Sequence, residues 1–357
     1  MITDPKESIS PIIKWDKGTA YDFFTSLFVI HHPNDFGLRS TWAAGVRSRL
    51  STTDRKILED IVEMIDIPFG WIYNLPSPKD AFTAIYTIKT MDPATCLIDI
   101  LCSSCEETLV TQTIRRVAAS GKWSKEDITQ VQTTLKNDFQ KSLPAKKVET
   151  MLTLWTKSSE YGSKAPAIFQ MYYYNFFLEE EERIKKAVDL TLSELQEKSK
   201  QLSWLELLEE ASRGINFNEF VNLEEITLVP SYWTTPLVIH GQLHSKKDRI
   251  ILFGARPLTE SLIPGEAVPD DLLRALKSLS DPTRLQILRI LSNQNLTQAE
   301  IAKKLRLRAP TITHHLHELR LAGLVGFDLT ESSRYYKIRK TNLDNVFSQL
   351  DEYLQKR

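Results

Sequence analysis

Three histidines stand close together in the segment TITHHLHELRLAGLV, at positions 314, 315 and 317. Imidazole nitrogens bind divalent metals, and they also exchange hydrogen bonds with polar ligands at neutral pH. A tetrahedral metal site needs three or four ligands. His314 and His317 would supply two, and neither a third ligand nor the H-E-x-x-H order of zinc proteases stands nearby in the sequence. We therefore predict no metal site here.

The same segment has the period of an amphipathic helix. On a helix that turns ~100° per residue, Ile312, Leu316 and Leu319 fall on one side, with His315 at the edge of that stripe. The opposite side carries short and polar side chains near its N-terminal end. A helix that enters the DNA major groove presents such a face to the base edges. We predict that the base-reading residues are Pro310, Thr311, Thr313, His314 and His317.

Basic residues flank this helix on both sides. From residue 268 to the end the chain has 15 Lys and Arg against 10 Asp and Glu, whereas the formal net charge of the whole chain is −1. Lys and Arg beside a reading helix contact phosphates, and an arginine at a wing turn reaches a minor groove. We predict phosphate and wing contacts at Lys303, Lys304, Arg306, Arg308, Arg334, Lys337 and Arg339, with Lys340 beside them.

The elements that position these side chains follow one another from residue 270. Asp281 stands as a helix N-cap before Pro282, and Thr297 and Glu300 have the spacing of a capping box. VGFDL and RYYKIRK alternate as two strands of a hairpin. The order helix, helix, helix, helix, hairpin, helix is that of a winged helix-turn-helix.

The chain has 357 residues, enough for two or three domains, and its 42% hydrophobic content is that of a globular protein. We predict a fold that is mainly α with a small β part, made of a helical N-terminal domain and a C-terminal winged helix-turn-helix. The predicted segments are a helical sensor or dimerisation domain, a β-rich element packed on it, a linker rich in Pro and Gly, and the winged helix, at residues 1–213, 214–256, 257–269 and 270–357.

The run ALKSLSDPTRLQILRIL contains Ser-Asp-Pro-Thr-Arg at 280–284, and LTQAEIAKKLRLRAPTITHHLHELRLAGLV ends in Ala-Gly-Leu-Val at 322–325. Together with RYYKIRK, these runs resemble the ArsR family of bacterial winged-helix transcription regulators over residues 270 to 340. The resemblance implies a homodimer on an inverted-repeat operator, with recognition helices in successive major grooves. It places the dimer contact on the terminal helix, at Leu343, Val346, Phe347, Leu350 and Leu354.

The sequence departs from this family at its known metal sites. Members sense metals through Cys-x-Cys at the start of the third helix, or through Asp and His on the terminal helix. LTQAEIA has no cysteine and the terminal helix has no histidine, so we expect neither metal sensing nor a cofactor. The run RAP replaces the usual serine-rich turn before the recognition helix. Residues 1–269 resemble the long N-terminal region of a subset of ArsR-like regulators at Trp42–Arg47 and Leu228–Pro236.

Residues 1–256 leave three alternatives open: a sensor of a small-molecule effector, a dimerisation body that senses nothing, and an enzyme. The aromatic run at 172–177 suits either an apolar pocket or a core. An enzyme has little support, since the sequence lacks a Gly-rich phosphate loop, G-x-S-x-G and H-E-x-x-H. We expect HHPND, with His31, His32 and Asp35, to form a loop after a helix.

The three cysteines fall on one helix that we predict to begin after Asp92 as its cap. Cys102 and Cys105 are three residues apart, so either a thiol pair or simple burial with Cys96 fits the spacing.

No run approaches the ~20 apolar residues of a membrane span, and the N-terminus lacks the apolar region of a secretory signal. We therefore expect a cytoplasmic, sequence-specific DNA-binding regulator, and a repressor rather than an activator. It would bind double-stranded DNA as a homodimer, with an unknown small-molecule effector and no enzyme activity. The alternative is an enzyme or small-molecule-binding body whose appended winged helix makes protein contacts.

Overall fold

The structure is a computed structural model that describes residues 10–103, 107–139, 142–217, 223–245, 247–257, 259–263, 268–329 and 333–355. It is mainly α with small sheets, as predicted, and it ends in a winged helix-turn-helix. Its described residues fall into two compact units: one within Met1–Trp15, Lys186–His240 and Ile251–Arg357, the other within Asp16–Lys185 and Gly241–Ile250. These units differ from the four segments expected from the sequence, whose separate roles stay a prediction.

The second unit is built from helices around α1. Almost every side chain of α1 is buried, including the polar side chains of Asp22, Thr25 and Ser26. Phe23 and Phe24 of α1 meet Phe169 edge to face, at 5.9 and 5.7 Å between ring centroids. The helical elements are α1 (Thr19–His31), η1 (Pro33–Phe36), α2 (Ser40–Arg47), α3 (Thr52–Ile65), α4 (Phe69–Tyr73), α5 (Ala81–Thr90), α6 (Cys96–Cys102), α7 (Leu109–Ser120), α8 (Lys125–Phe139), α9 (Ala145–Trp155), α10 (Ser158–Tyr172), η2 (Tyr173–Phe177) and the start of α11 (Leu178–Lys198).

The single helix predicted after Asp92 is wrong. Asp92 instead accepts a hydrogen bond from the backbone of Ala94, and α6 begins only at Cys96. Thr108 then caps a separate helix, α7, with a capping box that its Thr111 completes. The error came from reading one continuous apolar period across a second cap. Cys105 lies outside the described residues, so the proposed thiol pair is not described.

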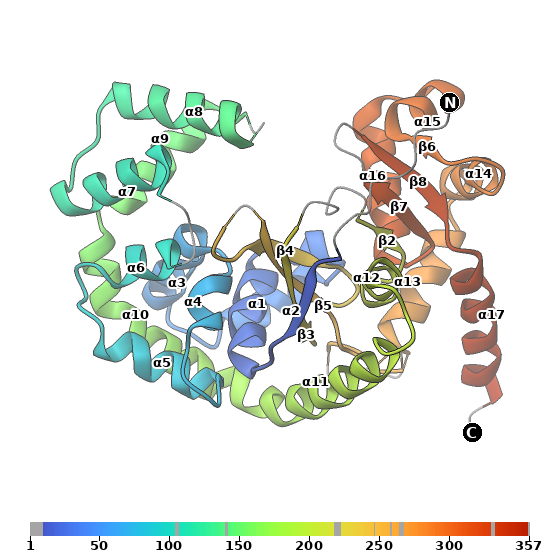
Figure 1. Ribbon diagram of the computed structural model, residues 1–357, viewed down its shortest axis with the longest axis horizontal. Helices are drawn as coiled ribbons and strands as arrows, with labels where there is room; N and C mark the ends of the chain where they lie inside the picture. The colour runs from blue at the N-terminus through green and yellow to red at the C-terminus, as the bar shows by residue number, and fades with distance from the viewer. Residues whose placement is uncertain are drawn as a thin grey trace. The chain divides into compact units, whose positions relative to one another are not determined.

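The first unit contains two four-stranded sheets (Figure 1). In one, the strand order is β1-β3-β5-β4, and β1 (Ile12–Trp15) runs parallel to β3 (Glu225–Ser231). The other strands of this sheet are β4 (Ile239–Gln242) and β5 (Asp248–Gly254). The end of β4 and the start of β5 belong to the second unit. The second sheet, ordered β2-β7-β8-β6, is the wing sheet with an extra strand, β2 (Ile215–Asn216), parallel to β7 (Val325–Leu329).

The winged helix itself follows the predicted order closely. Its elements are α13 (Asp270–Leu279), α14 (Pro282–Leu291), β6 (Leu296–Thr297), α15 (Gln298–Leu305), α16 (Ala309–Leu321), β7, β8 (Arg334–Ile338) and α17 (Lys340–Gln355), preceded along the chain by α12 (Trp204–Ala211). One apolar core joins them, and Ile215 of β2 packs against it. The wing sheet therefore pairs with a segment that lies about 55 residues before the winged helix begins.

We expect Asp281→Ala to lower the free energy of unfolding by about 1 kcal/mol, the usual effect of removing an N-cap. Asp281 accepts a hydrogen bond from the Arg284 backbone nitrogen at 2.9 Å at the start of α14. Urea unfolding followed by circular dichroism measures the change. Asp281→Asn is the matched control, since it keeps the cap and should lose less. Equal losses in the two variants would contradict a capping role.

Candidate nucleic-acid interface

The helix-turn-helix consists of α15 and α16, and local sequence signals set both ends of α15. Thr297 and Glu300 form the predicted capping box, with Thr297 nitrogen to Glu300 Oε2 at 2.7 Å. Arg306 ends the helix in the left-handed region, at φ 56°. Pro310 stands in the first turn of α16, where its missing N–H has no helical partner to lose.

The inner face of α16 is buried as its period predicts. Ile312, Leu316 and Leu319 are at most 1% exposed and belong to the winged-helix core. Glu318 ties the same helix to its neighbours, since its carbonyl oxygen accepts from Ser278 Oγ at 3.3 Å and its carboxylate lies 3.4 Å from Arg284. The rotation of α16 about its axis is therefore fixed.

The outer face of α16 is open to solvent. His314 is exposed and His317 is half-buried, while His315 turns to the edge of the core, as the helical period predicts. Just before the helix, the predicted phosphate contacts are all exposed. The exposed members of the two predicted sets are Pro310, Thr311, Thr313 and His314 on the helix and Lys303, Lys304, Arg306 and Arg308 beside it.

The hydroxyl of Thr313, which the sequence places on the outer face of α16, already has partners within the protein. Its hydroxyl donates to the Ala309 carbonyl oxygen at 3.0 Å and lies 2.5 Å from the Gln298 side-chain nitrogen. The hydroxyl is thus engaged within the protein, and its methyl group remains available for contact with a thymine methyl. Gln298 was not predicted, although its place at the first position of α15 brings its amide onto the same surface.

The wing divides the predicted cations into two groups. Arg334 is exposed at the start of β8, over the ring of Phe327 at 5.4 Å. Lys337, by contrast, lies 2.9 Å from Glu209 and 3.0 Å from Asp328. Burial by itself would lower the pKa of Lys337, but its hydrogen bonds to these two carboxylates outweigh it and raise the pKa. Two acidic partners already neutralise Lys337, which leaves it little charge to offer a phosphate.

Arg339 also points away from the exposed surface. Its guanidinium donates to the Gly323 carbonyl oxygen at 3.2 Å and lines a cavity within the first unit. The sequence predicted a single basic strip from Arg334 to Arg339. The pairing of β8 between β7 and β6, and the entry into α17, separate its members.

The sequence model of the bacterial regulatory protein, arsR family, matches residues 281–326, which span α14 to β7. The chain is 30% identical to the transcriptional repressor SdpR of Bacillus subtilis over 22% of this chain and 89% of that protein. It is 41% identical to an uncharacterized HTH-type transcriptional regulator of Methanocaldococcus jannaschii, over 20% of this chain and 75% of the relative. The arsenical resistance operon repressor of Staphylococcus xylosus is 32% identical over 23% of this chain and 78% of its own length.

The chain belongs to the arsR family of bacterial regulatory proteins. Its winged helix is accordingly that of a DNA-binding transcriptional regulator. These likenesses reach at most 23% of the chain, so they concern the winged helix and not the helical second unit.

The terminal helix of this arsR-family protein has two apolar faces. Val346, 4% exposed, is buried in the winged helix's own core, and Leu343 and Leu350 pack against that core. Phe347 and Leu354 are 55% and 72% exposed. Of the five residues expected at a dimer contact, three are thus engaged within the chain and two face outward, because residues at positions i and i+7 share a side of the helix.

The candidate histidines and cysteines of the N-terminal segment make structural contacts within the fold. Among the described residues, no group of three or more His, Cys, Asp and Glu is arranged to hold a metal ion. His31 bonds the Leu27 carbonyl oxygen through Nδ1 at 2.7 Å, and His32 lies against the ring of Phe28 before the 3-10 turn η1. Burial raises the pKa of the Cys96 thiol to about 11, which keeps it protonated at neutral pH.

None of the helices in the described ranges has both the length and the apolar character that a membrane span requires.

His315 is half-buried at the edge of the core, as its place on the helical stripe predicts, and Nδ1 is the ring nitrogen on the side of Asp281. That nitrogen is buried without a hydrogen bond and lies 3.9 Å from Asp281. Burial lowers the pKa of His315, and Asp281 only partly opposes this. The reason is that the ring is held at the edge of the aliphatic stripe, beyond hydrogen-bond distance of the carboxylate.

We expect His315 to make stability depend on pH in the weakly acidic range. Because its folded-state pKa lies below the unfolded value of about 6.5, its contribution is full above pH 6.5 and is lost as the pH falls through the lowered pKa. The urea midpoint of the wild type should therefore drop more between pH 7.5 and 5.5 than that of His315→Gln, which does not titrate. Parallel pH profiles for the two proteins would contradict this assignment.

Proposed function

We propose that this arsR-family protein is a cytoplasmic repressor that binds an inverted-repeat operator as a homodimer. The observation that carries the proposal is the outer face of α16, which is polar and exposed above a fully buried aliphatic stripe. Two of the relatives are named as repressors, which supports negative regulation. A dimer that covers promoter DNA blocks transcription by occupying it.

The proposed reading surface has base-contacting and phosphate-contacting parts. His314, His317 and Thr311 would exchange hydrogen bonds with base edges in the major groove, and the Thr313 methyl would contact a thymine methyl. Phosphates on either side would be met by exposed cations before the helix and at the wing. Those cations are Lys303, Lys304, Arg306, Arg308 and Arg334.

We propose the outward face of α17 as the dimer contact. Phe347 and Leu354 are large apolar side chains that the described structure leaves in solvent, on a helix whose opposite face is already buried. Covering two such side chains contributes roughly 3 to 5 kcal/mol, which offsets a large part of the entropy cost of association.

We also propose that the segment before the winged helix senses the signal. The wing sheet supports this link, since β2 pairs with β7 and Glu209 of the preceding helix reaches Lys337. A change in that segment would shift the two recognition helices relative to one another, and only one spacing fits both half-sites.

DNA binding is tested with the DNA upstream of the protein's own gene, by fluorescence anisotropy at ~150 mM salt with competitor DNA. We expect a discrete complex in the wild type. The double variant His314→Ala, His317→Ala should bind operator and scrambled DNA with nearly equal affinity, because base contacts supply the preference. Unchanged discrimination would remove these histidines from the reading role.

Arg308→Ala in the same assay should weaken binding to every sequence and lower the salt dependence by about one, the value of a single phosphate contact. Arg115→Ala, an exposed arginine of α7 in the second unit, is the matched control and should change neither quantity. A loss confined to the operator sequence would contradict the phosphate role.

Phe347→Ser with Leu354→Ser should convert the protein from dimer to monomer in sedimentation velocity. Both side chains are exposed in the single chain, so its fold and thermal unfolding should persist. The control Leu285→Ser removes a leucine of α14 that is 47% exposed, and it should leave the dimer intact. A double variant that still sediments as a dimer would place the contact elsewhere.

A further inference from the structure

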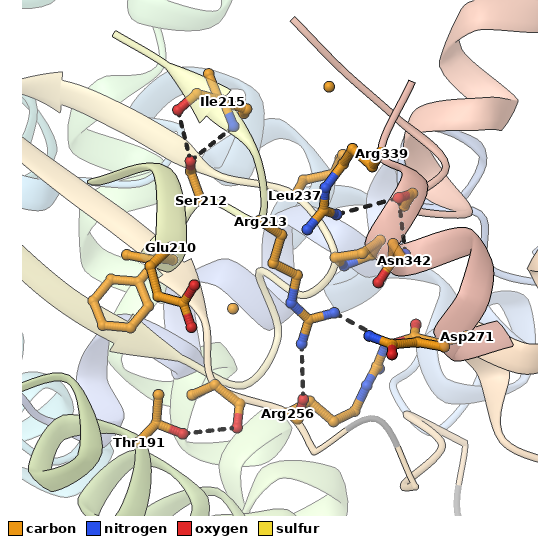
Figure 2. Close-up of a pocket in the computed structure, with 18 of the residues that line it drawn as sticks. Thr191, Glu210, Ser212, Arg213, Ile215, Leu237, Arg256, Asp271, Arg339 and Asn342 are labelled. Carbon is orange, nitrogen blue, oxygen red and sulfur yellow. Dashed lines mark hydrogen bonds and ion pairs between the residues drawn. The ribbon is translucent and has the colours of Figure 1, made fainter. Parts of the chain in front are cut away.

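A cavity of about 620 Å³ lies within the first unit, beside the winged-helix core. Its walls come from α11, α12 and the segment after it, from residues 253–257, and from the end of α16, β7 and the start of α17. This volume falls in the range of roughly 300–1,000 Å³ that small-molecule sites have. Figure 2 shows charged side chains that line it, among them Glu210, Arg213, Arg256, Asp271 and Arg339.

Three glycines leave room for the side chain of Arg339 in this cavity. A Cβ atom at Gly214, whose φ is +97°, would lie 2.5 Å from the Arg339 Nε, and one at Gly323 would lie 2.7 Å from Asn342 Nδ2. At Gly326 a Cβ would lie 2.3 Å from the Gly214 carbonyl oxygen. Arg339 and Asn342 both donate to the Gly323 carbonyl oxygen (Figure 2). The backbone is thus shaped to admit one guanidinium at this wall.

Arg256 supplies a second, more deeply buried guanidinium. Its side chain is 1% exposed, and its Nε and Nη1 have no hydrogen bond, although Asp270 lies 3.6 Å from Nη1. The Arg256 carbonyl oxygen accepts from Arg213, which also donates to Asp271 at 3.2 Å. Leaving buried donors of a cation without acceptors costs free energy, so the site favours an incoming acceptor.

The cavity has an excess of positive charge. Lys198 and Glu210 pair with each other at 2.5 Å, and Arg213 pairs with Asp271. The lining cations are Lys198, Arg213, Arg256, Arg320 and Arg339, and the lining carboxylates are Glu194, Glu210 and Asp271. Burial, followed by the nearby Arg213, lowers the pKa of Arg339 to about 10, so the ion is poorly solvated and close to another cation.

We propose that this cavity binds a small organic anion, whose carboxylate or phosphate group lies among the guanidiniums of Arg213, Arg256 and Arg339. The planar fork of an arginine matches both head groups. Apolar side chains on the other walls, including Leu237, Phe253 and Val325, suit a hydrocarbon body rather than a bare inorganic ion. The anion is the signal of the proposed repressor, and that regulatory part rests on the proposed function.

The position of the cavity gives the anion a route to the DNA-binding surface. The C-terminal end of α16 lines the cavity with residues 320–323, and α17 lines it with Asn345 and Gln349. An occupant that contacts both elements favours the arrangement in which its contacts are complete. Occupancy would thus alter the spacing of two recognition helices in a dimer.

Isothermal titration calorimetry of the full chain tests the site with three probes of similar size. Phenyl phosphate and phthalate carry the two head groups on an aromatic ring, and benzyl alcohol is the neutral comparison. We expect at least one anion to bind with a Kd below about 1 mM and benzyl alcohol to bind at least tenfold more weakly. The stronger anion identifies the head group.

Variants then locate the binding. Arg339→Met should raise the Kd of the bound anion at least tenfold, and Arg339→Lys should raise it less, because it keeps the charge without the fork. Arg289→Met removes an exposed arginine of α14 and should leave the Kd unchanged. Removing one of several crowded cations relieves repulsion, so Arg339→Met should unfold near the wild-type temperature. A folded Arg339→Met that binds as the wild type does would overturn the proposal.

Failure of both anions to bind at 10 mM, or equal binding of benzyl alcohol, would also overturn it. The signalling role of the anion is tested separately, by measuring the affinity for operator DNA at a saturating concentration of the anion. A change of fivefold or more, absent in Arg339→Met, supports it, and an unchanged affinity refutes the signalling role. Normal anion binding in a protein that forms no DNA complex would refute the proposed function and support the cavity.

Discussion

The DNA-reading account depends on the burial of one aliphatic stripe. Ile312, Leu316 and Leu319 are almost completely removed from solvent in the winged-helix core. Burying each contributes roughly 2 kcal/mol, so a rotation of α16 that hid the outer histidines would lose about 6 kcal/mol. No pair of exposed imidazole hydrogen bonds returns that much. The core therefore dictates which side chains of α16 face a ligand, and His314 is exposed because Ile312 and Leu316 are not.

The same chain uses its basic residues in two ways. Those before α16 stay in solvent, where a long-range attraction to phosphates acts at little desolvation cost. Those at the end of β8 and of α16 turn inward, where carboxylates neutralise Lys337 and glycines make room for Arg339. The helix before β2 supplies Glu209 as one partner of Lys337, and Gly214, just before β2, leaves room for Arg339. The segment and the winged helix share the wing sheet and these contacts, and they form part of one compact unit.

Sequence reasoning succeeded where a local rule decides the structure. The cap at Asp281, the capping box at Thr297 and the stripe of α16 depend on neighbours within four residues, and the structure has all three. It failed where distant segments decide. The pairing of Ile215 with Phe327 and the inward turn of Arg339 depend on residues more than a hundred positions away, and no periodicity in either segment reports them. The helix predicted across Cys102 failed for another reason, since the cap at Thr108 was present in the sequence and went unrecognised.

The most direct measurement of the central claim is dimethyl sulfate interference on the upstream DNA, because this reagent methylates guanine N7 in the major groove. If the outer face of α16 reads that groove in a dimer, interfering guanines will form two clusters whose centres lie about 10 base pairs apart on one side of the duplex. In His314→Ala, the same position of each cluster will lose its effect. Interference confined to adenine N3 in the minor groove, or an unaltered pattern in the variant, would contradict the account.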